Sequence, residues 1–236
     1  MKLFDMHVHT RGVSKCSRLS PEELCEAIKT EGSDGFILTN HYSAYMVDRD
    51  FIDWLHKYED EYYHVKDVAA SYGLRTLFGM EVTIDRRDYL LYGVKPSCLY
   101  ESKGPLYMYT LSELRDFAHE RGALLIHAHP WRFDGQPSDP SLLDGVEINC
   151  HPLYMDNCKR AAWDFAEKHH LLLTCGSDYH GDVYKAHCGM YLPDDLVDEE
   201  ELARYMKNIQ PLLLIHDIDE RRSIESNIHR KKENKT

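Results

Sequence analysis

Short apolar segments alternate with longer amphipathic segments along most of the chain. The apolar segments have the length of β-strands, whereas the longer segments repeat apolar residues every three or four positions, as in a helix that buries one face. Strands are expected over residues 3–9, 34–41, 74–84, 89–94, 123–128, 145–149, 171–175 and 212–215. Strands that alternate with helices are typical of successive βα units, so the pattern predicts an α/β fold.

Two of the expected helices begin with a capping sequence. Ser20-Pro21-Glu22-Glu23 combines an N-cap serine, a proline at the first helical position and a glutamate that can complete a capping box. Thr110-x-x-Glu113 is a second capping box. The remaining helices are expected over residues 51–72 and 157–169 and from the acidic run 194–201. The first of these carries a stripe of aromatic side chains, which indicates packing against the core.

The composition predicts a globular protein of the cytoplasm. Hydrophobic residues make up 43% of the 236, but no apolar run approaches the roughly 18 residues of a membrane span. Polar residues interrupt the N-terminal segment at once, so we expect no signal peptide. The 28 basic and 40 acidic residues give a net charge of −12, which disfavours nucleic acid polymers as partners. We expect one domain over residues 1–218 and a charged tail over 219–236.

The seven cysteines and 15 histidines lead to different predictions. The cysteines form no Cys-x-x-Cys pair, so we interpret them as reduced thiols that mainly fill the core. The histidines gather with acids at or just after the C-terminal ends of the expected strands. The residues concerned are Asp5, His7, His9, His41, Glu81, His127, His129, Asp178 and His180. Active sites of parallel βα folds assemble at that edge, so these side chains are expected to converge.

The chemistry of this set predicts a metal centre. Residues i and i+2 of a strand share a face, so His7 and His9 can bind one ion together. By the same geometry, His127 and His129 can project into one cavity. Imidazole and carboxylate ligands suit zinc, manganese or iron. The set exceeds the needs of one tetrahedral ion, and Glu81 can bridge two ions, so we expect at least a dinuclear centre.

The other histidines carry weaker signals. Five of them fall in expected helices and are expected to face solvent, namely His56, His64, His119, His169 and His170. His151 and His187 each follow a strand-like segment, so for both a contact with substrate or metal stays open.

Five short motifs follow one another between residues 4 and 180. They are Phe4-Asp5-Met6-His7-Val8-His9-Thr10, Thr39-Asn40-His41, Gly79-Met80-Glu81, His129-Pro130 and Gly176-Ser177-Asp178-Tyr179-His180. Together and in this order they resemble the polymerase and histidinol phosphatase (PHP) family of metal-dependent phosphoesterases. The resemblance implies a single-domain, distorted (β/α)7 barrel with two or three divalent ions at the C-terminal mouth of the strands.

The resemblance also implies how the ligands divide among the ions. One ion is surrounded by His7, His9, Glu81 and Asp178. Glu81 bridges to a second ion that His129 helps to hold. His41 and His180 match ligands of a third ion. His127 has no counterpart in the family, so its inclusion among the ligands rests on strand geometry alone.

Three positions depart from the family pattern. The family often has Asp or His shortly after the first His-x-His as a ligand of the third ion, whereas this chain has Gly12-Val13-Ser14-Lys15-Cys16-Ser17. The family also often has a histidine ligand a little beyond the glutamate, and this chain has Asp88 in that region. Asp88 either replaces that histidine as a ligand or is an exposed acid of a loop. Asn40 stands where Asp is usual, which places a neutral group beside the ligands.

The predicted activity is hydrolysis of a small phosphate ester, with a histidinol-phosphatase-like monoesterase among the candidates. A metal-bound hydroxide would attack phosphorus while Arg132 binds the phosphate. His180 or His41, where not a ligand, would protonate the leaving oxygen. The alternative interpretation of Arg132 is a surface arginine that does not bind phosphate. Two alternatives stay open: a metal-dependent amide or carboxylic ester hydrolase, and a metal-stabilised regulatory module without turnover.

Overall fold

The computed structural model describes residues 1–48, 50–132, 135–151, 156–181, 188–216 and 223–226. Its helices and strands follow one another as β1 (Lys2–Val8), α1 (Pro21–Thr30), β2 (Gly35–Leu38), β3 (His41–Tyr42), α2 (Phe51–Ser71), β4 (Arg75–Ile84), β5 (Arg87–Tyr92), α3 (Leu111–Glu120), β6 (Leu124–His127), β7 (Gly145–Asn149), α4 (Asp156–His169), β8 (Leu172–Gly176), β9 (Gly189–Leu192), α5 (Glu199–Asn208), β10 (Leu212–His216) and β11 (Ser223–Ser226). Short 3-10 helices occupy Pro96–Tyr100, Leu106–Met108 and Pro140–Leu142.

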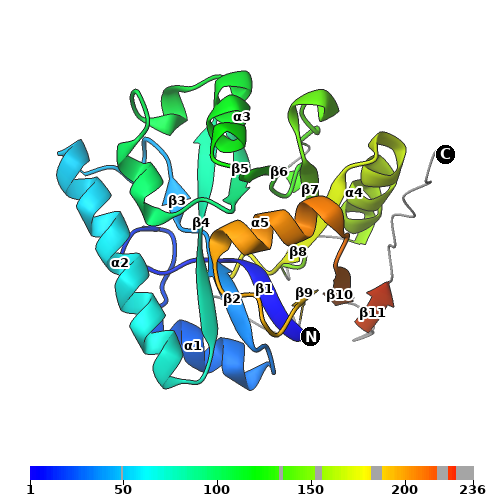
Figure 1. The fold of residues 1–236 in the computed structure, drawn as a ribbon, viewed down its shortest axis with the longest axis horizontal. Coiled ribbons are helices and arrows are strands. Elements are labelled where there is room, and N and C mark those ends of the chain that lie inside the picture. The colour runs from blue at the N-terminus through cyan, green and yellow to red at the C-terminus, as the bar shows by residue number, and fades with distance from the viewer. Residues whose placement is uncertain (49, 133–134, 152–155, 182–187, 217–222, 227–236) are drawn as a thin grey trace.

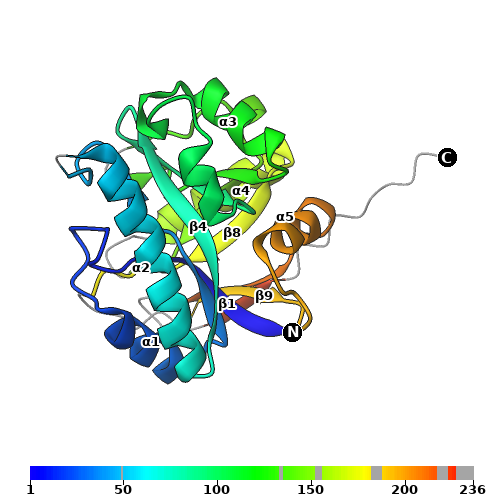
Figure 2. The same cartoon turned by 60° about the vertical axis from the view of Figure 1, so that its left-hand side comes forward.

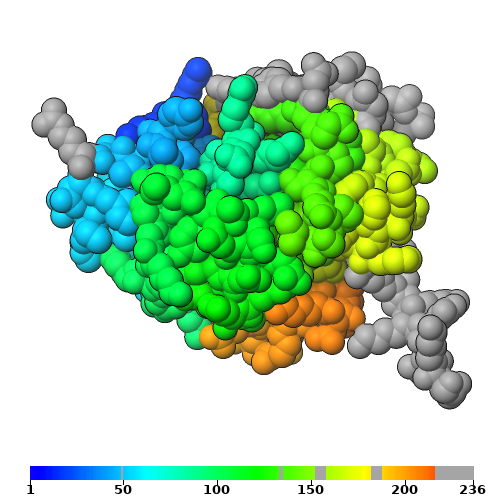
Figure 3. Space-filling view, turned by 90° about the horizontal axis from the view of Figure 1, so that it is seen from above, coloured from blue at the N-terminus to red at the C-terminus, as the bar shows by residue number. Residues whose placement is uncertain are grey.

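The strands form one curved, mixed sheet (Figure 1). Within the described residues it has 11 strands in the order β11-β10-β9-β1-β2-β4-β5-β6-β7-β8, with β3 paired to β4. The sheet curls until β8 returns to β1, where Val8 bridges Tyr179 and the Asp178 amide donates to the His7 carbonyl at 2.8 Å. The result is a nearly closed barrel with helices on its outside (Figure 2). Figure 3 shows the segments that include α3 (green), α5 (orange) and α4 (yellow) together on one face.

One part of the barrel departs from the predicted (β/α)7 repeat. The turn between β4 and β5 consists of Asp85 and Arg86, whose φ angles are both positive, at 48° and 63°. A two-residue hairpin turn of this kind reverses the chain and leaves no room for a helix. Consequently β5 runs antiparallel to both β4 and β6. A single α/β barrel is therefore confirmed, whereas the described residues do not show seven regular βα repeats.

Both predicted capping boxes are present. At the start of α1, the Ser20 hydroxyl accepts from the Glu23 amide at 3.2 Å, and Glu23 Oε2 accepts from the Ser20 amide at 2.7 Å. Thr110 and Glu113 make the same reciprocal pair at the start of α3. Each box satisfies two backbone donors that a helix start otherwise leaves open, so the local sequence determines where these helices begin.

Helix α2 packs its aromatic stripe onto the sheet and thereby holds a loop of the site. Trp54, Tyr58 and Tyr62 are each 1% exposed. The Tyr58 hydroxyl donates to the backbone carbonyl of Asn40. The same carbonyl accepts from the Glu81 amide at 3.2 Å. The turn between β2 and β3 is therefore fixed between α2 and β4.

The barrel closes at Gly176, where β8 passes very close to β1. A Cβ atom at position 176 would lie 2.5 Å from the Cβ of His7 and 2.6 Å from its backbone nitrogen. Such contacts are not tolerated in a packed interior. Glycine at this position therefore lets β8 approach the strand that carries His7.

The remaining strands extend the sheet beyond the barrel. On the other edge of β1, β9 pairs antiparallel, and β10 and β11 follow it. Strand β11 falls inside the predicted tail 219–236, of which only Ser223–Ser226 are described, so the boundary at residue 218 stays a prediction. In the part of the chain that the structure describes, no helix has both the length and the apolar character needed to cross a membrane.

Candidate metal centre

A cavity of about 840 Å³ opens where β1, β6 and β8 end. Its lining includes His41, His129, Arg132, Asp178 and His180. These residues come from distant parts of the sequence and meet because the C-terminal ends of the parallel strands share one edge of the barrel. The structure thus brings together most of the side chains that the sequence places after its strands.

Four buried side chains meet beneath this cavity and form the first group of candidate ligands. One ligand atom from each of His7, His9, Glu81 and Asp178 lies within 4.8 Å of the others. His7 Nε2 lies 3.4 Å from Glu81 Oε1. His9 Nε2 lies 3.2 Å from Asp178 Oδ1. Two ligands that are each about 2.1 Å from one tetrahedral ion lie about 3.4 Å apart, so these spacings suit a shared ion.

Glu147 of β7 fixes the orientation of His7. Its Oε1 lies 2.7 Å from His7 Nδ1. Its Oε2 accepts from the His129 amide at 3.1 Å and from Asn149 Nδ2 at 3.0 Å. A carboxylate that accepts from Nδ1–H leaves the Nε2 lone pair of the ring for a metal ion. The sequence analysis did not include Glu147, although an acid inside the expected strand 145–149 is the same signal that identified Glu81.

Ser14 fixes the orientation of His9 in a similar way. The Ser14 hydroxyl donates to Asn40 Oδ1 at 2.9 Å, so its oxygen is left to accept from His9 Nδ1 at 3.2 Å. Asn40 itself is held by Thr10, whose amide donates to the same Oδ1 at 2.9 Å. This chain of bonds places the ring proton of His9 on Nδ1 and leaves Nε2 unprotonated. The neutral Asn40 is therefore sufficient to organise the ligand.

Glu81, Asp88 and His129 form the second group of candidate ligands. His129 Nε2 lies 3.1 Å from Glu81 Oε1 and 4.0 Å from Asp88 Oδ2. Thr83 donates to the other oxygen of Asp88 at 2.7 Å and so holds the carboxylate in place. Asp88 is thus not an exposed loop acid, because it lies on β5 within reach of this group. Glu81 belongs to both the first and the second group.

His9, His41 and His180 form the third group. The Nε2 atoms of His41 and His180 lie 3.4 Å apart. His41 Nδ1 lies 2.6 Å from Glu81 Oε2, which follows from the register that pairs His41 of β3 with Glu81 of β4. His180 Nδ1 lies 2.8 Å from the backbone carbonyl of Asp178. The third group therefore joins the first two through Glu81 and His9.

The charges of the site favour a bound cation. Burial alone would raise the pKa of Glu81, but the rings of His41 and His7 outweigh it and hold that pKa well below its usual value. Burial lowers the pKa of His9, and His180 and His41 lower it further, so the ring is neutral. Burial also lowers the pKa of His7, but three nearby carboxylates outweigh it and raise that pKa. The carboxylates thus favour a positive charge at His7, and a divalent ion can supply that charge in place of the proton.

The buried ring nitrogens of His7 and His9 give a further reason to expect divalent ions. The rings of His7 and His9 are fully buried, yet neither Nε2 atom makes a hydrogen bond within the described residues. A buried polar atom without such a bond is costly unless something else binds it. Both atoms face buried carboxylates, and imidazole together with carboxylate is a ligand set that suits zinc, manganese or iron.

Two residues of the site have backbone strain. His129 and Asp178 have φ angles of 29° and 53°, in the left-handed region that side chains other than glycine rarely adopt. Such strain costs on the order of 1–3 kcal/mol per residue and is concentrated at functional sites. Here the left-handed backbone directs both side chains toward the ligand groups described above.

His127 and His151 lie at the cavity but outside the three ligand groups in the part of the chain that the structure describes. His127 and His129 both line the cavity, as expected, although strand β6 ends at His127 and the backbone of His129 is left-handed. Within the described chain, His127 belongs to none of the ligand groups. His127 Nδ1 instead accepts from the Ser138 amide at 3.1 Å. His151 lines the cavity outside those groups, and His187 lies outside the described residues.

Five of the seven cysteines are buried, in line with the expectation that they mainly fill the core, but Cys16 is not one of them. It is exposed and lines the cavity. Burial tends to raise the pKa of this thiol, but the rings of His180 and His41 outweigh that effect and lower it to about 6. Its place shortly after the first His-x-His was the available sequence signal for a position at the cavity.

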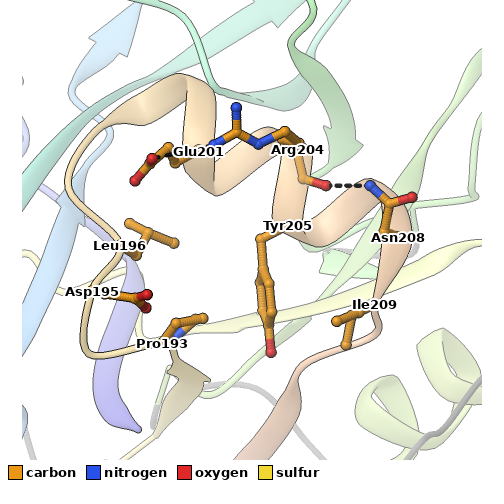
Figure 4. A pocket seen from close by; sticks show the side chains of 8 residues that line it. All are labelled: Pro193, Asp195, Leu196, Glu201, Arg204, Tyr205, Asn208 and Ile209. Atoms are coloured by element: carbon orange, nitrogen blue, oxygen red, sulfur yellow. Dashed lines mark hydrogen bonds and ion pairs between the residues drawn. The ribbon is translucent and has the colours of Figure 1, made fainter.

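A second hollow lies beside α5 and has no comparable chemistry. Its volume is about 330 Å³, and Pro193, Leu196, Tyr205 and Ile209 supply much of its lining (Figure 4). Two of the charged side chains there pair with each other, since Arg204 lies 3.2 Å from Glu201. We therefore place the candidate site at the larger cavity.

No family model matches the sequence, and no curated protein matches it. Solved structures do resemble the fold. PsfC from Pseudomonas syringae has a TM-score of 0.61 at 18% identity, over 91% of each chain. An amidohydrolase from Chromobacterium violaceum, solved with sulfate and no metal, has a TM-score of 0.59 at 14% identity, over 86% of this chain and 96% of its own. A provisionally assigned metal-dependent phosphoesterase from Bifidobacterium adolescentis has a TM-score of 0.54 at 18% identity, over 86% and 94%. At such identities these similarities establish the fold alone.

Proposed function

We propose that this chain is a metal-dependent hydrolase that releases phosphate from a small phosphate ester and uses two or three divalent ions of zinc, manganese or iron. The observation that carries the proposal is the position of Glu81. One carboxylate is common to two groups of candidate ligands and also lies against His41. A shared carboxylate is what a pair of neighbouring ions requires.

The ligand sets follow the three groups. The first ion is assigned to His7, His9, Glu81 and Asp178, the second to Glu81, Asp88 and His129, and the third to His41 and His180. Bound divalent ions would make a nearby water more acidic and draw negative charge from phosphoryl oxygens. His127 is left out because its Nδ1 accepts from the backbone of Ser138. His41 and His180 would act as proton donors only in a form that holds two ions.

The cavity offers cationic side chains that suit an anionic substrate, beside the aspartates of its lining. Arg86, Arg87 and Arg132 all line it, although the chain as a whole has a net charge of −12. Arg132 Nη1 lies 3.8 Å from Asp178 Oδ2, so its guanidinium stands beside the first group. Guanidinium donates two parallel hydrogen bonds to a phosphate. Arg132 therefore has the role of binding the phosphoryl group.

Two further lines support the assignment. The five ordered motifs resemble the PHP phosphoesterases, and one structural neighbour carries a provisional phosphoesterase assignment. Another neighbour is named an amidohydrolase, and this observation keeps amide or carboxylic ester hydrolysis as the second candidate.

A substrate panel tests the proposal. Protein reconstituted with manganese or with zinc is assayed on phosphate monoesters, amides and carboxylic esters, beside His9→Ala and Asp178→Ala. We expect phosphate release by the wild type and loss of both metal and turnover in the two variants, which should still fold. Hydrolysis of amides or esters alone would support the second candidate. Metal-loaded protein that is inactive on every substrate would instead indicate a regulatory module.

A further inference from the structure

We propose that Cys150, Cys175 and Cys188 form a second metal site, which binds one copper(I) ion through three sulfur atoms. Within the described residues, the three sulfurs lie within 4.8 Å of one another, and none of these cysteines belongs to the histidine and carboxylate groups. The inference goes beyond the proposed function, because the site needs neither hydrolysis nor the ions beneath the cavity.

The spacing of the sulfurs suits one shared ion. The sulfurs of Cys150 and Cys175 lie 3.5 Å apart, and no pair among the three is more than 4.8 Å apart. Two sulfurs that are each about 2.3 Å from one ion lie roughly 4 Å apart. An ion between the three sulfurs therefore requires shifts of less than about 1 Å from the positions that they already hold.

Neighbouring strands fix the positions of the three cysteines. Cys150 directly follows β7, and its amide donates to a backbone carbonyl of β8 at 2.8 Å. Cys175 lies on β8, and its thiol donates to the Leu214 carbonyl of β10 at 3.2 Å. Cys188 directly precedes β9, whose first residue, Gly189, pairs with Leu214. The cluster therefore lies where the barrel wall meets the added strands β9 and β10.

Gly189 allows the close packing that brings Cys188 into this cluster. Its φ angle is 145°, and a Cβ atom at this position would clash with the Phe4 carbonyl of β1. Residues other than glycine rarely adopt such a backbone conformation. Glycine thus lets β9 lie close against β1 with Cys188 at its start.

Full burial separates this cluster from reactive thiols and restricts the ions that it can bind. All three cysteines are 0% exposed. The thiolate is the reactive form and also the metal ligand, but burial raises the pKa of Cys175 and of Cys188 well above its usual value. In the absence of an ion these two thiols are therefore protonated and unreactive. A cation must bind sulfur strongly to displace their protons.

Copper(I) meets these requirements better than zinc. Soft sulfur ligands select copper(I) or zinc from the ions of the first transition series. Structural zinc takes four ligands, whereas this group in the described chain contains three sulfurs and no histidine or carboxylate. Copper(I) is stable with three sulfurs and binds thiolate more tightly than zinc does. On binding, copper–sulfur bonds replace S–H bonds, the protons pass to solvent, and copper remains copper(I).

Competition with the copper(I) chelator bathocuproine disulfonate tests the site, using the full-length, reduced protein without oxygen. Because the cysteines are buried, copper(I) is offered both to the folded protein and during refolding from urea. We expect the wild type to retain one copper(I) per chain against the chelator. His9→Ala, which damages the histidine and carboxylate groups, and Cys158→Ser, a control at another cysteine, should retain it as well. Cys175→Ala and Cys188→Ala should weaken binding by roughly 100-fold or more, since loss of an orienting partner alone costs roughly 10- to 100-fold.

X-ray absorption at the copper edge of the wild type gives a second measurement that needs no variant. We expect three sulfurs at about 2.3 Å from copper and no nitrogen. Nitrogen neighbours, only two sulfurs, no copper retained against the chelator, or equal retention by Cys175→Ala would overturn the inference and leave the three thiols as core packing. None of these outcomes changes the expected phosphate release, so the proposed function would stand or fail by its own assay.

Discussion

The substitution Glu147→Gln tests whether the hydrogen bond at His7 Nδ1 controls metal binding at His7 Nε2. In the wild type, one carboxylate oxygen faces His7 Nδ1 at 2.7 Å, and the other accepts from the His129 amide at 3.1 Å and from Asn149 Nδ2 at 3.0 Å. Glutamine has only one oxygen. If that oxygen faces His7, the new NH₂ group meets two donors. If it faces those donors, the NH₂ group donates to Nδ1 and places the ring proton on Nε2, where the ion must bind.

Either orientation weakens the metal site. Loss of a partner that orients a histidine ligand typically lowers metal affinity by roughly 10- to 100-fold. A tenfold change is about 1.4 kcal/mol, so the expected loss of binding free energy is about 1.4 to 2.8 kcal/mol. Because the group is fully buried, the mismatched donors also cost about 1–3 kcal/mol of folding stability.

The assay is competition for zinc between metal-free protein and a chromogenic chelator. Glu120→Gln is the matched control, because it makes the same chemical change on a side chain that is 76% exposed. Urea unfolding of the metal-free proteins separates stability from affinity. An affinity of Glu147→Gln within about twofold of the control would refute the reasoning, since the predicted loss starts near tenfold.

Three other predictions follow from the structure. His127→Ala should leave the metal content unchanged, whereas His129→Ala should remove one ion per chain by elemental analysis; equal losses would contradict the division of ligands. Gly176→Ala should lower stability to urea by about 1–3 kcal/mol or more, because its Cβ would lie 2.5 Å from another Cβ, whereas Gly104→Ala, with no atom within 4 Å, should have little effect. Arg132→Ala should raise KM for a phosphate ester by roughly 10- to 100-fold with metal content unchanged, and an unchanged KM would exclude it from phosphate binding.

Much of the fold follows from local sequence signals. The capping boxes predict where two helices begin, and the aromatic stripe of α2 predicts which face it buries. The antiparallel β5 was not predicted, because apolar periodicity identifies a strand but not its direction. The direction depends on the turn formed by Asp85 and Arg86, neither of which is the glycine that usually indicates such a hairpin.

The candidate site was predictable where acids and histidines end strands, and less so elsewhere. His127 and His129 both line the cavity, but the different roles of the two rings depend on the left-handed backbone of His129, which strand alternation does not reveal. Glu147 resembles any acid of a half-exposed strand until burial on both faces of β7 is known. Cys16 resembles any other thiol until the fold shows that its loop reaches the cavity.

The most direct test of the account is where metal binds. Anomalous diffraction from crystals grown with manganese or zinc locates each ion without reference to activity. The account predicts one peak among His7, His9, Glu81 and Asp178 and a second among Glu81, Asp88 and His129, with the Glu81 carboxylate contacting both ions. Crystals that show no peak beneath the cavity at saturating metal, or ions bound only at other places, would contradict it.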